Sequence, residues 1–374
     1  MGEQRATNEI LGRQQLNRAL LQRQMLLERQ VATETDVIEH LVGMQAQVPT
    51  NPYYALWSRI VDYRPEELSA MVADGRAVRA PLMRTTLHLI TAADCLTLYP
   101  LMLPVLARTL KNTPFGKSTQ DMDYSLLLDR ARELLKQEPK TLKQLGPLLQ
   151  ERWPDHNPSH LANVVHYMLP MLQVPPRGTW GASHQATWAT VEDWLGKLLD
   201  PEPSVEEVIL RYLAAFGPAT SSDIRTWSGL TGLRESVARL KPELRTWRDE
   251  RGRELLDLPD APLPDPETPA PPRFLPEFDN ILLSHADRTR IISDDDRKRL
   301  MTPNAVLPGT FLLDGYVHGT WRIERTRTSA RLLLQPFRPT PPEHNASLLD
   351  EAGALLRFAA GDVTDHDVVI VDAD

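Results

Sequence analysis

The chain of 374 residues contains a single cysteine, Cys95, and this scarcity excludes whole classes of structure. One thiol cannot form an internal disulfide or build a multi-cysteine zinc site. The ten histidines are scattered without the spacing of metal ligands, so we expect no metal. We expect Cys95 to be a small buried residue near a helix start, the alternative being a catalytic thiol.

Long apolar runs and several catalytic motifs are also missing. The longest runs, such as LTLYPLMLPVLA, reach about half a membrane span, and the N-terminus MGEQRATNEILGRQQ lacks the apolar core of a signal peptide. The sequence shows no Gly-rich phosphate loop, no Gly-x-Ser-x-Gly elbow and no His-Glu-x-x-His pair. We therefore expect a cytoplasmic protein with no membrane partner and no cofactor.

What is present is the composition of an ordinary folded protein. Hydrophobic residues make up 41% and charged residues 25%, which is far from the composition of disordered chains. The length exceeds that of a single core, so we expect about two to four domains. The net charge of -8 argues against generic polyanion binding, but WRIERTRTSARLLLQPFR remains a locally basic stretch.

Short helices followed by two short strands form a pattern that occurs three times. In the first copy, apolar residues of 9–28 show helical spacing, and a second helix begins behind Thr33 with Asp36 in a capping box. That helix is predicted to end near Met44 or Gln45, and AVRAPLMRTTLHLIT is predicted to be a hairpin. The other copies start at YSLLLDRARELLKQ and SVEEVILRYLAAFG, and the last closes on the hairpin LRTWRDERGRELLDL. Three helices with a two-stranded wing define a winged helix-turn-helix.

The C-terminal part has a different pattern. Residues 258–273 hold seven prolines and cannot form a regular ladder of hydrogen bonds. After them, short apolar runs broken by Pro-Gly, Asp-Gly and His-Gly favour a small antiparallel sheet or barrel. We predict an α+β protein of tandem winged-helix modules followed by a C-terminal antiparallel β-barrel. The boundaries are 1–120, 121–200 and 201–257 for the modules, 258–273 for the Pro-rich linker and 274–374 for the barrel.

Two glutamines, Gln45 and Gln47, stand before a Val-Pro step, which favours extended backbone. Residues two apart on extended backbone point the same way, so these amides share one space while Ala46 faces the domain. Such a pair can hold a water molecule without charge, which suits an electrophile that is already positive, such as a purine alkylated at N7. The alternative is that both amides cap the helix end or bridge it to the next loop.

Two further groups are candidates for contact with DNA. In LMRTTLHLIT, read as a strand, Arg84, Thr86 and His88 share one face and form a phosphate-contacting edge; the alternative is a wing with a solvated polar face. The second group surrounds a predicted hairpin tip, Thr328 to Ala330, and consists of Arg325, Arg327 and Arg331. Basic hairpins are also ordinary solvated edges that discourage aggregation.

These motifs occur together in an order that resembles the bacterial AlkZ-like and AlkX (YcaQ-like) family of winged-helix DNA glycosylases. The resemblance covers about residues 10 to 370 and rests on HLVGMQAQVPTNPYYALWSRI, LMRTTLHLIT, QVPPRGTWG, RFLPEFDNILLSHADR and NAVLPGTFLLDGYVHGTWRIER. It implies three winged-helix modules and a barrel curved around DNA. It also implies that Gln45-Ala46-Gln47 is the catalytic Gln-apolar-Gln tripeptide that positions the hydrolytic water.

The resemblance implies a monofunctional glycosylase that acts on double-stranded DNA as a monomer, excises N7-alkylated purines and extends to interstrand crosslinks. One alternative is a DNA-binding module or transcription regulator without chemistry, in which PSHLANVVHYMLPML and RESVARLKPEL would read the major groove. Neither segment is strongly basic, which disfavours that alternative. A third hypothesis, a protein that sequesters a genotoxin, requires a deep apolar pocket.

Overall fold

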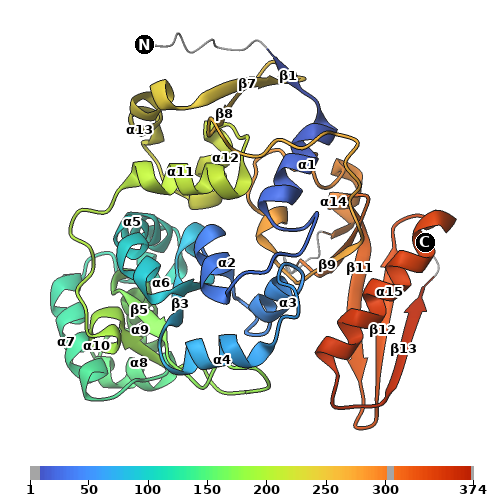
Figure 1. Cartoon of the computed structure of the whole chain (residues 1–374). Coiled ribbons are helices and arrows are strands. Elements are labelled where there is room, and N and C mark those ends of the chain that lie inside the picture. The colour runs from blue at the N-terminus through green and yellow to red at the C-terminus, as the bar shows by residue number, and fades with distance from the viewer. Residues whose placement is uncertain (1–8, 301–306, 372–374) are drawn as a thin grey trace.

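The structure is a computed structural model that describes residues 9–300 and 307–371. Helices and strands alternate along the chain, and the strands form three sheets (Figure 1). The predicted α+β class is therefore confirmed. Within the described residues, no helix is both long and apolar enough to cross a membrane.

The N-terminal third places the glutamine segment between helices and the first sheet. Its helix α2 begins behind Thr33, whose side chain accepts the Asp36 N–H while the Asp36 carboxylate accepts the Thr33 N–H, so the predicted capping box is confirmed. The elements are β1 (Ile10–Leu11), α1 (Arg13–Arg23), α2 (Glu34–His40), β2 (Met44–Gln45), α3 (Asn51–Trp57), α4 (Pro65–Ala73), β3 (Ala77–Pro81), η1 (Met83–Thr85), β4 (Leu87–Thr91), α5 (Ala92–Lys111) and α6 (Pro114–Ser118).

The second predicted module shares a sheet with the first. Its elements are α7 (Tyr124–Gln137), α8 (Leu142–Gln150), α9 (Pro158–Met168), β5 (Met171–Gln173), β6 (Trp188–Thr190) and α10 (Val191–Leu195). Strand β5 pairs with β3 through Arg79 and Gln173, which gives one sheet of order β2-β4-β3-β5-β6. The two predicted wings are therefore joined edge to edge in one five-stranded sheet.

The third predicted module carries its own hairpin, as its sequence indicates. Its elements are α11 (Val205–Phe216), α12 (Ser221–Ser228), α13 (Leu233–Leu240), η2 (Lys241–Glu243), β7 (Arg245–Asp249) and β8 (Glu254–Asp257). Strands β7 and β8 are antiparallel, and β1 from the start of the described chain pairs with β7 in parallel. This sheet thus joins the N-terminal segment to residues more than half a chain away.

The predicted closed antiparallel barrel is wrong. The C-terminal elements are β9 (Arg273–Leu275), η3 (Asn280–Leu282), α14 (Asp294–Leu300), β10 (Gly309–Leu313), β11 (Tyr316–Arg325), β12 (Ser329–Pro336), α15 (Pro342–Ala359) and β13 (Asp365–Ile370). They form an open sheet of order β13-β12-β11-β10-β9, in which β12 and β13 are parallel. The physical reason is α15, because a helical crossover returns the chain in parallel and covers the apolar sheet face, so closure is not needed to bury it.

The Pro-rich stretch runs from the end of β8 to β9 and follows α1. Arg23 donates from Nη2 to the Pro262 carbonyl at 3.1 Å, and Arg18 donates from Nε to the Thr268 carbonyl at 2.6 Å. Both arginine side chains are buried. The carbonyl groups that this stretch cannot use in a ladder are therefore satisfied partly by side chains of α1.

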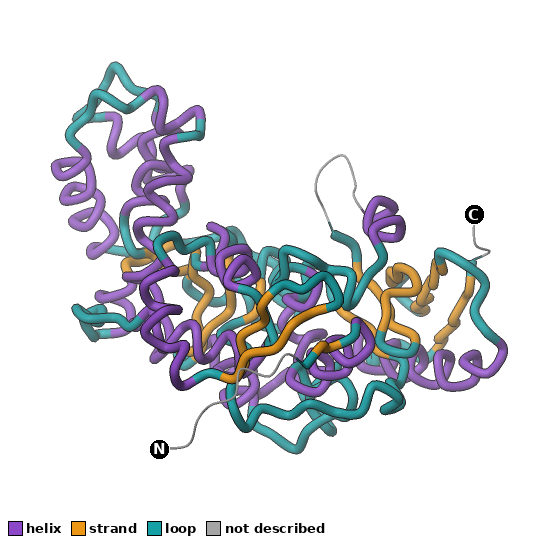
Figure 2. Tube along the Cα trace, turned by 90° about the horizontal axis from the view of Figure 1, so that it is seen from above, coloured by secondary structure: helices purple, strands orange, loops and turns teal. Residues whose placement is uncertain are grey.

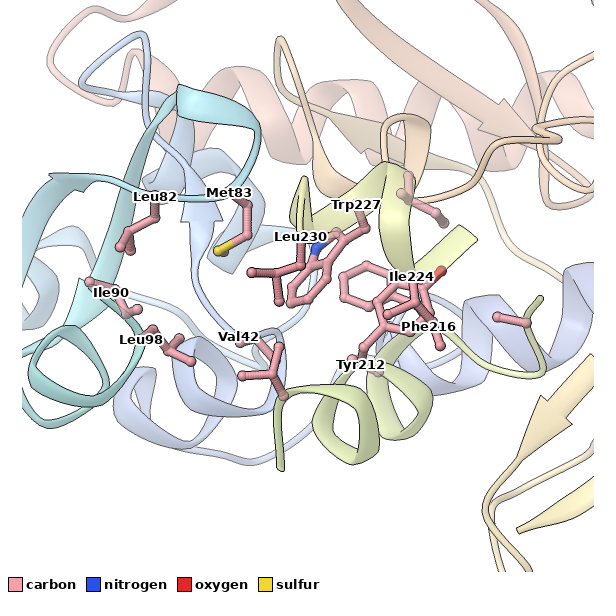
Figure 3. Packing of buried hydrophobic residues seen from close by; sticks show 14 of the residues in the cluster. Val42, Leu82, Met83, Ile90, Leu98, Tyr212, Phe216, Ile224, Trp227 and Leu230 are labelled. Carbon is pink, nitrogen blue, oxygen red and sulfur yellow. The ribbon is translucent and has the colours of Figure 1, made fainter. Parts of the chain in front are cut away.

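Buried contacts tie the distant segments together. Figure 3 shows aromatic residues of α11 and α12, including Tyr212, Phe216 and Trp227, beside Val42 and Leu230. A buried ion pair also joins distant segments: the two Nη groups of Arg59 each donate a hydrogen bond to the Asp279 carboxylate at 3.0 Å. In the view of Figure 2, a lobe of helices projects at the end of the body opposite the C-terminus.

Candidate active site

Gln45 ends strand β2, whereas Ala46 follows the strand and Gln47 lies in a bend; the helix before them ends earlier than predicted. Helix α2 ends at His40, and Gly43, at φ 84°, turns the chain into β2. Strand β2 pairs with β4 in antiparallel register, with Gln45 opposite His88, and the Ala46 N–H donates to the Leu87 carbonyl at 2.7 Å. The backbone of the tripeptide is thus fixed against β4.

Burial along the tripeptide does not show the predicted alternation, because Gln45 is nearly as buried as Ala46. The Ala46 side chain is fully buried, Gln45 is 7% exposed, and Gln47 is exposed. The Ala46 carbonyl accepts a hydrogen bond from Arg79 Nη2 at 2.6 Å. Gly178, from the quoted stretch QVPPRGTWG, makes room for this arginine, because a Cβ there would lie 2.7 Å from Arg79 Cδ.

Each glutamine amide has one oxygen lone pair engaged by the protein. Gln45 Oε1 accepts a hydrogen bond from Arg84 Nη2 at 3.0 Å, and Gln47 Oε1 accepts the Leu87 N–H at 3.4 Å. An amide oxygen has two lone pairs, so each can still accept a hydrogen bond from a water molecule. These contacts orient both amides without using their whole capacity.

Arg84 lies in a tight turn instead of the predicted strand. Residues Met83–Thr85 form η1, with Arg84 at φ 56° and Thr85 at φ 61°, and β4 begins only at Leu87. Arg84 therefore does not alternate with Thr86 and His88 on one strand face. The left-handed turn lets its guanidinium bridge Gln45 Oε1 and the Trp227 carbonyl, the latter at 2.8 Å.

His88 and Thr86 form hydrogen bonds next to the same turn. His88 is fully buried; its Nδ1 lies 2.9 Å from the Thr86 carbonyl, and its Nε2 lies 3.5 Å from Arg84 Nη2. Burial lowers the His88 pKa to about 3, so the ring is neutral and donates from Nδ1. The Thr86 hydroxyl donates to the Met83 carbonyl at 3.1 Å. The structure thus gathers Arg84, Thr86 and His88 behind Gln45.

Burial also lowers the pKa of Arg84, to about 10, and the charge of Arg288 acts in the same direction. Arg84 therefore remains protonated at neutral pH. The Arg288 side chain is only partly buried, and its recorded hydrogen bond runs from Nε to the His285 carbonyl at 3.4 Å. In the sequence, Arg288 carries no signal beyond its place in RFLPEFDNILLSHADR.

A turn of the C-terminal part completes the surroundings of the glutamines. The Gln45 N–H donates to Asn280 Oδ1 at 3.3 Å, and Asn280 Nδ2 donates to the Gly43 carbonyl at 2.7 Å. Asn51 fastens the same turn by donating to the Glu277 carbonyl at 2.7 Å. Sequence reasoning missed Asn280, whose one signal was an acid-and-amide run directly after a short strand.

The basic hairpin exists, but two of its three arginines are paired. Strands β11 and β12 meet at a tip that carries exposed Arg327, which has no ion-pair partner among the residues that the structure describes. Arg325 donates to Asp362 at 2.6 and 2.7 Å, and Arg331 donates to Asp367 at 3.0 Å. The hairpin belongs to the C-terminal sheet, whereas Gln45 lies in β2, at the edge of a different sheet.

The thiol of Cys95 is unsuited to nucleophilic chemistry. It is fully buried in α5, as predicted, and burial raises its pKa to about 12. Among residues 9–300 and 307–371, no group of three or more His, Cys, Asp and Glu side chains is arranged to hold a metal ion. The hydrogen-bonded amides of Gln45 and Gln47 therefore form the best-organised candidate site.

Comparison with known proteins identifies the class. A family model described as "DNA glycosylase AlkZ-like" matches residues 38–358, most of the chain. The match makes the protein a DNA glycosylase, a hydrolase of N-glycosyl bonds, which confirms the predicted enzyme class. The chain belongs to the AlkZ-like family of these enzymes, as the resemblance implied.

One curated relative and one solved structure are similar over nearly their whole length. The "Interstrand DNA cross-link repair glycosylase" of Streptomyces sahachiroi is 24% identical over 360 residues, covering 86% of this chain and 89% of the relative. The structure of Streptomyces sahachiroi DNA glycosylase AlkZ superposes with a TM-score of 0.75 at 21% identity, covering 97% of this chain and 100% of the other. The second likeness concerns the fold alone.

Proposed function

We propose that this enzyme releases N7-alkylated purines from double-stranded DNA by holding a water molecule between Gln45 and Gln47. The observation that carries the proposal is the amide pair at the end of β2 and just beyond it, each oxygen oriented by one protein donor, with no second donor among the described residues. Neither amide titrates, and the nearby His88 is neutral. Such a site positions water but is poorly equipped to act as a strong base.

An N7-alkylated purine needs little more than a placed water. Alkylation gives the base a positive charge, so the electrons of the bond between N9 and C1′ move to the base as it leaves. The oxygen of the held water forms the new bond to C1′, and the proton that it loses passes to solvent. The products are the free base and an abasic site. Positioning of the attacking atom supplies the rate.

The proposed substrate range includes interstrand crosslinks, which fits the name of the Streptomyces sahachiroi relative. A guanine tied to both strands cannot swing out into a deep pocket, so its enzyme must reach it within the groove. No lysine precedes Lys111 in the sequence, so no Schiff-base nucleophile adjoins the glutamines in the chain. We propose that the enzyme leaves the sugar–phosphate backbone intact.

The decisive experiment measures free base released from duplex DNA that contains N7-methylguanine. Gln45→Ala and Gln47→Ala should each slow release by roughly 10- to 100-fold, the cost of a misplaced reactant. Gln137→Ala, which removes an exposed glutamine at the end of α7, is the matched control and should not change the rate. Tight duplex binding without base release by the native protein would contradict the proposal and favour a DNA-binding module.

A second substrate tests the extension to crosslinks. Duplex DNA joined by an N7-to-N7 interstrand crosslink should separate into single strands on a denaturing gel after incubation. Each strand should keep its full length until the abasic site is cleaved with alkali. Release of N7-methylguanine without separation of crosslinked strands would restrict the enzyme to single-base lesions.

A further inference from the structure

Strand β2 is the edge of its sheet, and Asn280 takes the place of a missing neighbour. Strand β4 pairs with one side of β2. On the other side, Asn280 Nδ2 donates to the Gly43 carbonyl at 2.7 Å, while Asn280 Oδ1 accepts the Gln45 N–H at 3.3 Å. A residue of a parallel strand bonds in this way to two alternate residues of its neighbour. The side chain of Asn280 therefore imitates one residue of a further strand.

Asn280 is itself held rigidly. It is 4% exposed at the start of η3, and its carbonyl accepts a hydrogen bond from the Ser284 hydroxyl at 2.5 Å. The carboxylate of the preceding residue, Asp279, accepts hydrogen bonds from both Nη groups of Arg59 at 3.0 Å, and both residues are buried. A bidentate pair of this kind fixes the turn in orientation as well as position. The amide of Asn280 thus reaches β2 already ordered.

Strand β2 needs hydrogen-bond partners on its outer side, the side that faces Asn280. Val42 at φ 54° and Gly43 at φ 84° separate α2 from β2, so the helix does not continue into the glutamine segment. An edge strand leaves its outer N–H and C=O groups open to competing water. Without Asn280, the main chain of Gln45 would keep its hydrogen-bond pairing on the β4 side only.

We propose that Asn280 is a positioning residue for base release, which acts by fixing the main chain of Gln45. The inference rests on the proposed function, in which Gln45 and Gln47 hold the water. The side-chain hydrogen bonds of Asn280 to this segment go to its main chain, at Gln45 N–H and the Gly43 carbonyl, so its effect passes through the strand. A residue from the C-terminal part of the chain thereby completes a site whose chemistry lies in the N-terminal part.

The test compares three variants in single-turnover release of N7-methylguanine. Asn280→Ala removes both bonds, and the isosteric Asn280→Asp keeps the acceptor but sets an oxygen against the Gly43 carbonyl. Both should slow release by roughly 10- to 100-fold while DNA affinity stays unchanged. Asn17→Ala is the matched control, since Asn17 is also buried and donates to two carbonyls, those of Arg290 and Gly315, yet makes no hydrogen bond with β2, the glutamines or the turn of Asn280 among the described residues. It should retain the native rate.

A double variant separates positioning from general damage. If Asn280 acts through Gln45, adding Asn280→Ala to Gln45→Ala should cost nothing further, because both changes remove one function. Losses that multiply, or a native rate in Asn280→Ala alone, would overturn the inference and leave the proposed function intact.

Hydrogen exchange tests the inference even if the native protein releases no base, an outcome that contradicts only the proposed function. Amide exchange in residues 42–48 should be faster in Asn280→Ala than in Asn17→Ala, because the Gln45 N–H loses its acceptor. Equal exchange in the two variants would overturn the role of Asn280.

Discussion

At the residue scale, the positive charge of Arg84 is unexpected, because it would repel the positively charged purine of the proposed substrate. Its hydrogen bonds explain its place: the guanidinium fork joins Gln45 Oε1 at 3.0 Å to the Trp227 carbonyl at 2.8 Å. With the oxygen of Gln45 fixed by this donor, the amide cannot rotate freely. We predicted Arg84 as a DNA contact, and the geometry favours a role in orienting Gln45.

Arg84→Lys separates these two roles. A lysine keeps the charge but lacks the planar fork that reaches two acceptors at once. Losing one bond from a charged donor, about 1.5 kcal/mol, should slow base release roughly tenfold with DNA affinity unchanged. Single-turnover kinetics and titration with duplex DNA measure the two quantities.

The control is Arg76→Lys, at an exposed pair with Asp74, which should behave like the native protein. Weaker DNA binding by Arg84→Lys, with a reduced dependence on salt, would instead show that Arg84 reaches the phosphates.

At the scale of elements, the hairpin of β11 and β12 presents one unpaired arginine at its tip. Arg327→Ala should weaken duplex binding and lower the slope of affinity against salt by about 0.9, the value for one phosphate contact. Arg325→Ala should have a smaller effect, because its guanidinium is already neutralised by Asp362. Binding titrations at several salt concentrations measure both.

The reverse variant, Asp362→Asn, frees Arg325 and should raise affinity. If Arg327→Ala and Asp362→Asn both leave binding unchanged, the hairpin does not lie against DNA.

Local patterns predicted some elements and missed others. The capping box at Thr33 and the hairpins of β7–β8 and β11–β12 depend on residues close in sequence, and the structure contains all three. The barrel prediction failed because it overlooked the helical segment that became α15. That helix covers the sheet face with Leu348, Leu355 and Leu356, so the sheet stays open. A strand pattern alone cannot show what will cover the strands.

At the scale of the whole molecule, buried histidines make the fold sensitive to acid. Burial lowers the pKa of His88 to about 3 from an ordinary 6.5, and it lowers that of His285 to about 3 as well. Unfolded chains therefore take up protons below pH 6.5 that the folded protein does not. The stabilisation by the two neutral rings is complete above pH 6.5 and is lost as the pH falls toward 3.

Lowering the pH from 7 to 5 should reduce the free energy of unfolding by about 2 kcal/mol for each of these rings. Denaturant titrations at the two pH values measure the change. His285→Gln removes one titrating ring and should flatten the dependence, whereas equal stability of the native protein at both values would contradict the prediction.

The sequence alone determined the mixed fold class and the family, because each depends on composition or on the order of motifs along the chain. Tertiary structure decided how the glutamines are held. Asn280 lies 235 positions from Gln45, and Arg84 reaches the Trp227 carbonyl across 143 positions. Packing brings such buried polar groups within about 3 Å of one another, and each then requires a hydrogen-bond partner. No pattern in the local sequence shows which partner that will be.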